Sequence, residues 1–297
     1  MKKPTVRVTN KMRNSIAGYG FISLWFIGLI VFTLFPLGQA IWYSFNIAEF
    51  KGSGIQTTFN GFKNFVYAFT EDSTFPQMLV TYLSSIIVQV PFSVTASLII
   101  SMLLNQNIKG RGMWRVIFFL PVIISTGPVI TELMGQGATS LPMIGGKDLD
   151  IFLADFLPGF IAKPIGLLFD NLIIVLWYTG IPTLIFLSGL QRIDKSTYEA
   201  ASIDGASPWQ CFWKITLPSM KSFIFVNVVY TIVTLSFSDI PAGDNQLNIL
   251  QYMQRHMIEA SGKGYGYACS LGLIYFAVIL LQIVIYSLFL APRKGNR

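Results

Sequence analysis

The chain has 297 residues, of which 53% are hydrophobic and only 12% are charged. Soluble domains carry about 25% charged residues, so this composition excludes an ordinary soluble protein. The net charge of +7 lies in short basic segments beside apolar stretches, which is typical of membrane topology signals and not of nucleic-acid binding. We therefore predict an all-α, polytopic membrane protein.

Six apolar stretches are long enough to cross a bilayer as helices, which takes about 20 residues each. They lie at about residues 17–43, 78–104, 114–135, 168–190, 221–241 and 268–291. The first stretch exceeds signal-peptide length and ends without a small-residue cleavage site, so we expect it to be retained. The predicted organisation is a cytoplasmic tail (1–16), a first helix with an extracytoplasmic loop (17–77), a core of five helices (78–291) and a second cytoplasmic tail (292–297).

The loops between these stretches differ in their content of Lys and Arg. With six spans, fifteen of these residues fall on the side of the two termini and six fall on the other side. Because cytoplasmic loops are enriched in Lys and Arg, we predict that both termini are cytoplasmic. That placement requires an even number of spans.

Residues 149–169 are apolar enough to suggest a seventh span. The segment carries three charged residues, which are costly in a bilayer, and two prolines and a glycine, which we expect to break any helix. A seventh crossing would also place one terminus outside. We predict an interfacial or re-entrant segment at the extracellular face; the residues concerned are Asp150, Asp155, Pro158, Gly159, Lys163 and Pro164.

The polar gap at 191–220, between the fourth and fifth stretches, has the local signals of a helix–turn–helix. Ser196 and Glu199 have the spacing of a capping box that would begin the first helix. Gly205 can adopt the left-handed conformation that ends it, and Ser207 followed by proline predicts the start of a second helix. An aromatic face on that second helix suits a membrane interface and consists of Trp209, Phe212 and Trp213.

Seven residues of this gap follow the pattern EAA-x3-G-x9-I-x-L-P, from Glu199 to Pro218. The pattern resembles the signature loop of the membrane subunits of bacterial ABC importers. The resemblance implies the ABC type I importer permease fold, and a docking loop at 191–220 that inserts into a groove of a cytoplasmic ATPase and transmits its closure. The ATPase-docking residues that it implies are Glu199, Ala200, Ala201, Asp204, Gly205, Ile215, Leu217 and Pro218.

Other segments resemble the carbohydrate, maltose-type subfamily of these permeases. Asp194 departs from that subfamily, which commonly has proline there, so the start of the turn stays open. The resemblance implies a carbohydrate substrate, with oligosaccharide, disaccharide, monosaccharide and glycerol phosphate all open. The segments that carry it are 103–112, 118–121, 187–191 and 204–207, and residues 59–70 resemble the outer-face stretch that precedes the core of ABC importer permeases in general.

The same resemblance implies the partners and the location. It places the chain in a bacterial cytoplasmic membrane, among lipid, with a second homologous permease, two cytoplasmic ATPase subunits and an extracytoplasmic solute-binding protein. The resemblance implies a transport subunit that is not an enzyme and has no cofactor of its own. The sequence has no GxxxxGK[ST] loop, so we expect no ATP site on this chain; ATP and Mg would bind the ATPase subunits. We expect no metal site, because His256 has no partners at ligand spacing.

Polar residues inside the spans are candidates for a substrate path, because such residues are costly in a bilayer and usually face a cavity or a partner. We selected a stripe on the fifth span, an aromatic pair beside a predicted kink on the fourth, and one acid on the third; together they suit sugar hydroxyls and C–H faces. These residues are Asn227, Tyr230, Thr231, Thr234, Ser238, Asp239, Trp177, Tyr178 and Glu132. Helix packing is an equal alternative for the stripe, and the partner permease is an alternative holder of the substrate.

Two other functions fit a polytopic membrane protein. A secondary transporter driven by an ion gradient would need intramembrane acid or base relays and paired repeats of spans, and the sequence shows few such residues and no clear repeat. A membrane-embedded enzyme would need a His, Cys or Ser–Lys constellation within the spans, and the sequence has none. The ABC permease is the leading hypothesis and the secondary transporter is the alternative.

Overall fold

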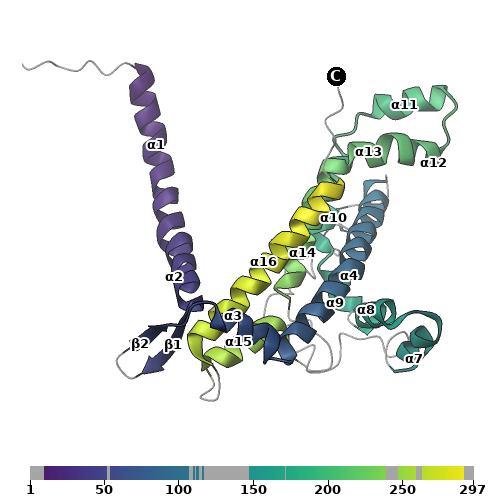
Figure 1. The fold of residues 1–297 in the computed structure, drawn as a ribbon. Helices are drawn as coiled ribbons and strands as arrows, with labels where there is room; N and C mark the ends of the chain where they lie inside the picture. The colour runs from purple at the N-terminus through teal and green to yellow at the C-terminus, as the bar shows by residue number, and fades with distance from the viewer. Residues whose placement is uncertain are drawn as a thin grey trace, which may run out of the picture. The chain divides into compact units, whose positions relative to one another are not determined.

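The computed structural model describes residues 10–51, 54–106, 110, 112–113, 116, 147–170, 172–238, 247–258 and 263–290. Within these residues the chain is helical apart from short turns and one two-stranded hairpin (Figure 1). The elements are α1 Asn10–Leu29, η1 Ile30–Leu34 (a π-helical turn), α2 Phe35–Ser44, β1 Asn46–Lys51, β2 Gly54–Phe59, α3 Lys63–Thr70, α4 Thr74–Asn105, α7 Lys147–Phe156, α8 Gly159–Asp170, α9 Leu172–Trp177, α10 Gly180–Leu190, α11 Lys195–Ile203, α12 Pro208–Cys211, η2 Phe212–Thr216 (π-helical), α13 Leu217–Ser219, α14 Lys221–Ser236, α15 Ile249–Ile258 and α16 Gly264–Leu290.

The chain forms two compact units, which we describe separately. The first comprises Met1–Glu71 with Met253–Ile274, and the second comprises Asp72–Tyr252 with Tyr275–Arg297. Helix α16 belongs to the first unit in its first part and to the second unit in the remainder.

Three helical stretches of the described residues are long and apolar enough to cross a membrane: Gly18–Ser44, Thr74–Asn105 and Gly264–Leu290. They agree with the first, second and sixth predicted spans. Two further helix pairs reach that length only across a bend, Ile161–Asp170 with Val175–Leu190 at 75° and Pro208–Ser219 with Lys221–Ser236 at 66°. The predicted third span, 114–135, lies outside the described residues except for Val116.

The predicted fourth span, 168–190, is interrupted. Helix α9 ends at Trp177 and α10 begins at Gly180, and between them the Thr179 hydroxyl donates to the Leu176 carbonyl oxygen at 2.6 Å. Pro182 then lies in the first turn of α10, where backbone N–H groups have no partner within the helix. The helix is interrupted beside Gly180 and Pro182, where the sequence predicted a kink, but the 75° bend of this predicted span lies earlier, between Asp170 and Val175.

Residues 149–169 fall in two helices. Helix α7 ends at Phe156 and α8 begins at Gly159, so the predicted break is present at Pro158, and Gly159 is the first residue of the second helix. The prediction was wrong for Pro164, which lies inside α8. Proline is tolerated within membrane helices because neighbouring groups can satisfy the backbone carbonyl that it frees.

The segment after the first span holds a β-hairpin that the sequence did not predict. Strands β1 and β2 pair antiparallel, with Asn46 opposite Phe59. Asn46 and Ala48 are buried while the residues between and after them are exposed, which is the period of two of a half-buried strand. The Asn64 amide on α3 donates to the carbonyl oxygens of Ser44 and Asn46, each at 3.0 Å, so the start of the hairpin is anchored to α3.

Two glycines at the start of α16 allow close backbone contact with this hairpin in the first unit. Gly264 has a φ of +79°, and a Cβ there would lie 2.6 Å from the Ala48 carbonyl oxygen. A Cβ on Gly266 would overlap the carbonyl oxygen of Asn46. Any side chain larger than hydrogen at these positions would therefore separate α16 from the strand.

In the second unit, α4 packs against α8, α10 and α14. Its polar series Ser93, Ser97 and Ser101 is fully buried. The Ser97 hydroxyl donates to the Ser93 carbonyl oxygen of its own helix at 2.6 Å and lies 3.5 Å from the Thr179 carbonyl oxygen. These small side chains lie where helices meet, which is typical of helix packing in membranes.

We expect Gly266→Ala to destabilise the protein, because the added methyl group needs the space of a backbone oxygen that cannot rotate away. Overpacking of this kind costs about 1–3 kcal/mol. The matched control is Gly272→Ala in the same helix, where the methyl group would meet only the Met253 sulfur at 3.9 Å and where alanine is the better helix former. Thermal unfolding of the purified protein measures both variants, and equal melting temperatures would contradict the close contact.

Candidate functional site

Residues 191–220 fold into a helix–turn–helix that connects α10 to α14 (Figure 1). Helix α11 forms its first arm, Lys195–Ile203. The consecutive elements α12, η2 and α13 form its second arm, Pro208–Ser219. The architecture is the one that the caps and the turn glycine predicted, and it brings all the docking-pattern residues into one loop.

The first arm begins at a different cap from the predicted one. Asp194 is the N-cap of α11, and its carboxylate accepts the backbone N–H of Ser196 at 3.1 Å. The predicted capping box of Ser196 and Glu199 is wrong, because Ser196 already lies inside the helix. The departure from proline at Asp194 now has a reason, since an acidic N-cap satisfies an unpaired N–H and complements the helix dipole.

Gly205 ends the first arm in the left-handed conformation that the sequence predicted, with φ at +77°. The Ala206 N–H donates to the Ala201 carbonyl oxygen at 2.9 Å, and the Gly205 N–H to that of Ser202 at 3.1 Å. This pair of bonds is a Schellman C-cap. Nothing lies within 4 Å of a Cβ built on Gly205, so the fold needs glycine here for its backbone and leaves the surface of the turn open.

The second arm begins at Ser207, as predicted. The Gln210 N–H donates to the Ser207 hydroxyl at 3.3 Å, and the Ser207 N–H donates to the Gln210 side chain at 2.8 Å, which completes a reciprocal capping box. Pro208 follows the cap in the first turn. The arm then passes through the π-helical turn Phe212–Thr216 and bends by 66° into α14.

One hydrogen bond ties the two arms together, and sequence reasoning missed it. The Tyr198 hydroxyl on the first arm lies 2.8 Å from the Thr216 hydroxyl on the second arm. Thr216 is buried. A tyrosine and a threonine so far apart in sequence give no local signal, so only the folded loop reveals the bond. Because it joins the arms beyond their common turn, it limits the change in angle between them.

The eight docking-pattern residues differ in exposure. Three are half-buried, namely Ala201, Ile215 and Leu217, and five are exposed, namely Glu199, Ala200, Asp204, Gly205 and Pro218. The exposed ones come mainly from the first arm and its turn. Ile203, which the pattern does not include, is 86% exposed at the end of the same arm, so this end of the loop offers both polar and apolar contacts.

The predicted polar stripe on the fifth span contains two fully enclosed residues. Asn227 and Thr231 on α14 are 0% and 2% exposed. In the part of the chain that the structure describes, both amide atoms of Asn227 and the hydroxyl of Thr231 lack a hydrogen-bond partner. The Ser93 hydroxyl on α4, which packs against α14, is in the same situation. Buried polar groups are rarely left unpaired, so these unpaired groups between α4 and α14 require an explanation.

The remaining stripe residues have different surroundings. Tyr230 and Thr234 are half-buried on α14. Ser238 is buried just after α14, and its hydroxyl donates to the Leu235 carbonyl oxygen at 2.7 Å. On the fourth span, Trp177 and Tyr178 are half-buried at the interruption before α10. Two further path candidates, Glu132 and Asp239, lie outside the described residues.

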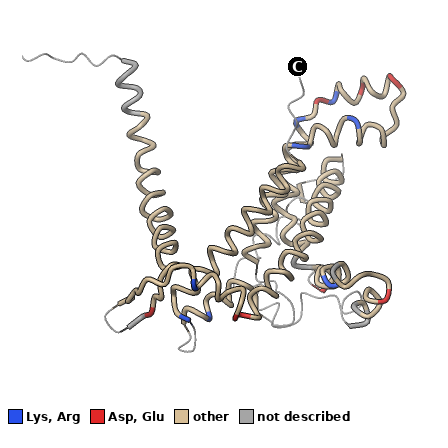
Figure 2. Tube along the Cα trace, viewed as in Figure 1, with Lys and Arg blue, Asp and Glu red and all other residues tan. Residues whose placement is uncertain are grey.

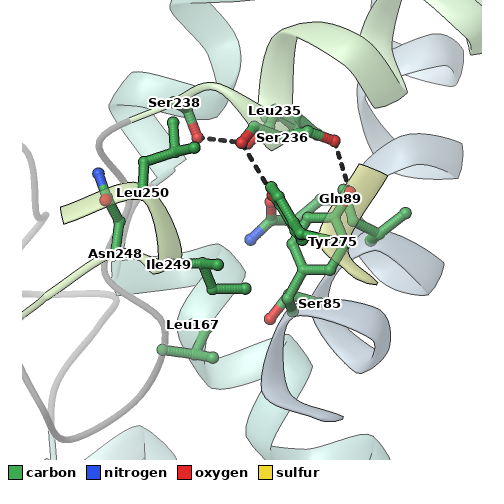
Figure 3. A pocket seen from close by; sticks show the side chains of 12 residues that line it. Ser85, Gln89, Leu167, Leu235, Ser236, Ser238, Asn248, Ile249, Leu250 and Tyr275 are labelled. Atoms are coloured by element: carbon green, nitrogen blue, oxygen red, sulfur yellow. Dashed lines mark hydrogen bonds between the residues drawn. The ribbon is translucent and has the colours of Figure 1, made fainter. Parts of the chain in front are cut away.

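A cavity of about 40 Å³ lies in the second unit among α4, α8, α14, α15 and α16 (Figure 3). Its polar lining includes Ser85 and Gln89 of α4, Ser238, and Asn248 just before α15. Of the path candidates that the structure describes, only Ser238 lines it. A cavity needs about 10–15 Å³ of such volume to hold one water molecule, so this cavity can hold water.

Beside this cavity a hydrogen-bond network joins three helices. The Tyr82 hydroxyl on α4 bonds to the Ser236 hydroxyl on α14 and lies 3.1 Å from the Gln282 side-chain oxygen on α16. The Tyr275 hydroxyl on α16 donates to the Ser236 carbonyl oxygen at 2.8 Å. Sequence reasoning singled out none of these residues, because the groups come from three helices and meet only after folding.

Comparisons with known proteins agree with this architecture. A family model described as "binding-protein-dependent transport system inner membrane component" matches residues 73–293. The probable ABC transporter permease protein YesP of Bacillus subtilis is 33% identical over 236 residues, which cover 77% of this chain and 73% of the relative. The lactose transport system permease protein LacF of Rhizobium radiobacter is 31% identical over 245 residues, covering 79% and 78%.

A longer match covers nearly the whole chain. The multiple sugar-binding transport system permease protein MsmF of Streptococcus mutans is 29% identical over 292 residues, or 94% of this chain and 98% of the relative. Among solved structures, a chain of a bacterial ABC transporter that imports alginate has a TM-score of 0.62 at 19% identity, covering 96% of this chain and 98% of that one. This last likeness concerns the fold alone.

Proposed function

Because this chain belongs to the family of inner membrane components of binding-protein-dependent transport systems, we propose that it is the permease subunit of an ATP-driven ABC importer for a carbohydrate. The docking loop is the observation that carries the proposal. Its pattern from Glu199 to Pro218 folds into a capped helix–turn–helix with an open surface at Gly205. Family membership also excludes the secondary-transporter alternative.

The names of several relatives support a carbohydrate substrate. The relatives are named for lactose, for multiple sugars, for arabinooligosaccharides and for trehalose or maltose. Another is named for osmoprotective compounds. We therefore propose a sugar or oligosaccharide as the substrate class of this chain.

We propose that the working complex contains a second homologous permease, two cytoplasmic ATPase subunits and an extracytoplasmic solute-binding protein. The family description includes the binding protein, and a solved alginate transporter of similar fold is in complex with a periplasmic protein. ATP and Mg would bind the ATPase subunits, so that this chain transmits the energy of hydrolysis without catalysing it and binds no cofactor of its own.

The geometry of the loop supports a mechanical route from ATPase to membrane. A displacement of the first arm at Gly205 reaches the second arm through the turn and through the Tyr198–Thr216 hydrogen bond. The second arm continues directly into α14 across the 66° bend. Closure of the ATPase would thus move the helix that carries the polar stripe.

We propose that the substrate passes the face of α14 that includes Asn227, Tyr230, Thr231 and Thr234. Leaving a buried polar group unpaired costs about 1–3 kcal/mol. Packing against α4 accounts for the burial of Asn227 and Thr231 but not for their unmet hydrogen bonds. Sugar hydroxyls both donate and accept, so an open state in which sugar meets these groups would satisfy them. Further path residues in this proposal are Ser238, Asp239, Trp177, Tyr178 and Glu132.

We expect Gly205→Leu to abolish uptake while the subunit still inserts into the membrane. A side chain in the left-handed conformation costs about 1–2 kcal/mol, and leucine would also fill the surface that the ATPase approaches. Uptake of labelled sugar, with co-purification of the ATPase, measures the effect. The control is Gly205→Asn, since asparagine tolerates this conformation and should keep the turn and more of the activity. Normal uptake by Gly205→Leu with bound ATPase would refute the docking assignment.

Both termini are proposed to be cytoplasmic, on the basis of the unequal distribution of Lys and Arg. A membrane-impermeant thiol reagent added outside should label a cysteine introduced at Lys147 or Lys263. It should not label a cysteine at Lys195 or Lys294. External labelling at Lys195 would overturn the proposed topology.

Asn227→Ala and Tyr230→Ala should each reduce uptake while sparing assembly and basal ATP hydrolysis. The loss of one partner for a sugar hydroxyl predicts a reduction of roughly five- to a hundred-fold. The matched control is Thr183→Val on α10, whose buried hydroxyl already donates to its own helix at 2.8 Å and should not affect uptake. If both α14 variants transport at the unaltered rate, or if they fail to assemble, the stripe serves packing instead.

A further inference from the structure

The two arms of the docking loop differ in charge. The first arm, its cap and its turn carry three acids and one lysine, all exposed: Asp194, Lys195, Glu199 and Asp204. Exposed Arg192 precedes the cap at the base of the loop, where its guanidinium lies over the Phe223 ring of α14 at 5.7 Å. The second arm and the first residue of α14 carry two exposed lysines, Lys214 and Lys221, and no acid (Figure 2). In the sequence no acidic residue occurs between Asp204 and Asp239. One loop therefore offers an acidic surface and, separately, a basic one.

The basic arm also carries the exposed aromatic residues. Trp209 is 69% exposed and Trp213 is 50% exposed. With Phe212 they form one cluster, in which the Trp209 and Trp213 ring centroids are 5.5 Å apart and those of Phe212 and Trp213 are 5.2 Å apart. A continuous exposed apolar surface of this kind indicates a contact with a protein partner or with a membrane.

The direction of the second arm distinguishes between these two kinds of contact. Residues Pro208–Ser219 lie at 66° to Lys221–Ser236. Membrane-spanning helices are tilted by about 20° from the bilayer normal on average, so a segment bent this far from α14 lies nearer to the membrane plane than to the normal. It also joins α14 directly at Lys221, where that helix begins.

We propose that the aromatic cluster and Lys214 of the second arm, together with Lys221 at the start of α14, bind the anionic headgroup region of the cytoplasmic leaflet. Tryptophan is enriched at this depth because its ring is amphipathic. Lysines beside an interfacial helix are attracted to anionic lipids, and Lys214 and Lys221 follow the aromatic cluster along the chain. The acidic first arm would be repelled by the same lipids, which leaves it in the aqueous phase for the ATPase. The assignment adds a lipid contact to the proposed function and rests on its cytoplasmic placement of the loop.

A spin label on each arm tests the assignment in the complete complex, reconstituted in nanodiscs with phosphatidylglycerol. The variants Trp213→Cys and Ser202→Cys, each with Cys211→Ser and Cys269→Ser, carry the label on the second and first arms. We expect oxygen, which concentrates in lipid, to relax the label at 213 more than a water-soluble nickel complex does. The order should reverse at 202. Both leaflets of the nanodisc have the same composition, so the result does not depend on which side of the membrane the loop occupies. A failure of the lipid-contact proposal can therefore be told apart from a wrong topology.

Lipid charge provides the second measurement. A basic residue near an anionic surface contributes about 1 kcal/mol, so Lys214→Gln or Lys221→Gln should raise the ratio of nickel to oxygen relaxation at 213 up to about fivefold. Replacing phosphatidylglycerol by phosphatidylcholine should do the same, whereas the control Lys195→Gln on the first arm should have no effect. Equal nickel access at 213 and 202 would refute the proposal. If the label at 213 is protected from nickel to the same extent in either lipid and in both lysine variants, this face contacts a protein partner instead of lipid. That result would also refute the proposal.

Discussion

Close packing of α10 against α14 holds the two ends of the docking loop together. A Cβ on Gly189 would lie 2.8 Å from the Phe223 ring and 2.9 Å from the Met220 methyl group, so glycine is what permits the helices to approach this closely. Met220 is fully buried at the same place. Because the chain leaves α10 at Leu190 and re-enters the membrane helix at Lys221, this contact fixes the base from which both arms project. Because this packing holds the base of the loop together, a displacement of the loop tip would be transmitted to α14.

The polar residues of the second unit divide into two chemical groups. Short hydroxyl side chains such as Ser97 and Thr183 donate to a carbonyl oxygen one turn earlier in their own helix, so their burial needs no help from another helix. The amide of Asn227 offers two donors and an acceptor and has none of them satisfied. A helix that contains such an amide is held less tightly in this arrangement than an all-hydroxyl helix would be. The seam between α4 and α14 thus combines close packing with a built-in reason to rearrange.

Local chemistry predicted the parts of the docking loop that depend on neighbouring residues. The left-handed turn at Gly205 and the cap at Ser207 followed from residue type and spacing alone. The first cap did not, because Asp194 and Ser196 are both good cap formers two residues apart, and only the path of the chain out of α10 selects between them. The Tyr198–Thr216 bond and the β-hairpin were missed for a related reason: each depends on groups that meet only after folding. The hairpin packs against α16 only because Gly266 has no side chain, and that contact is not visible in the local sequence.

That contact between Gly266 and Asn46 also sets an order of events during synthesis. The two residues are separated by about 220 positions in the sequence, and ribosomes add about 5–20 residues per second. The first span and its hairpin therefore precede the start of α16, which packs against the hairpin, by roughly 10–45 s of synthesis. Throughout that interval the hairpin of the nascent chain has its anchor on α3 but lacks the α16 backbone that contacts Asn46 and Ala48 in the folded chain.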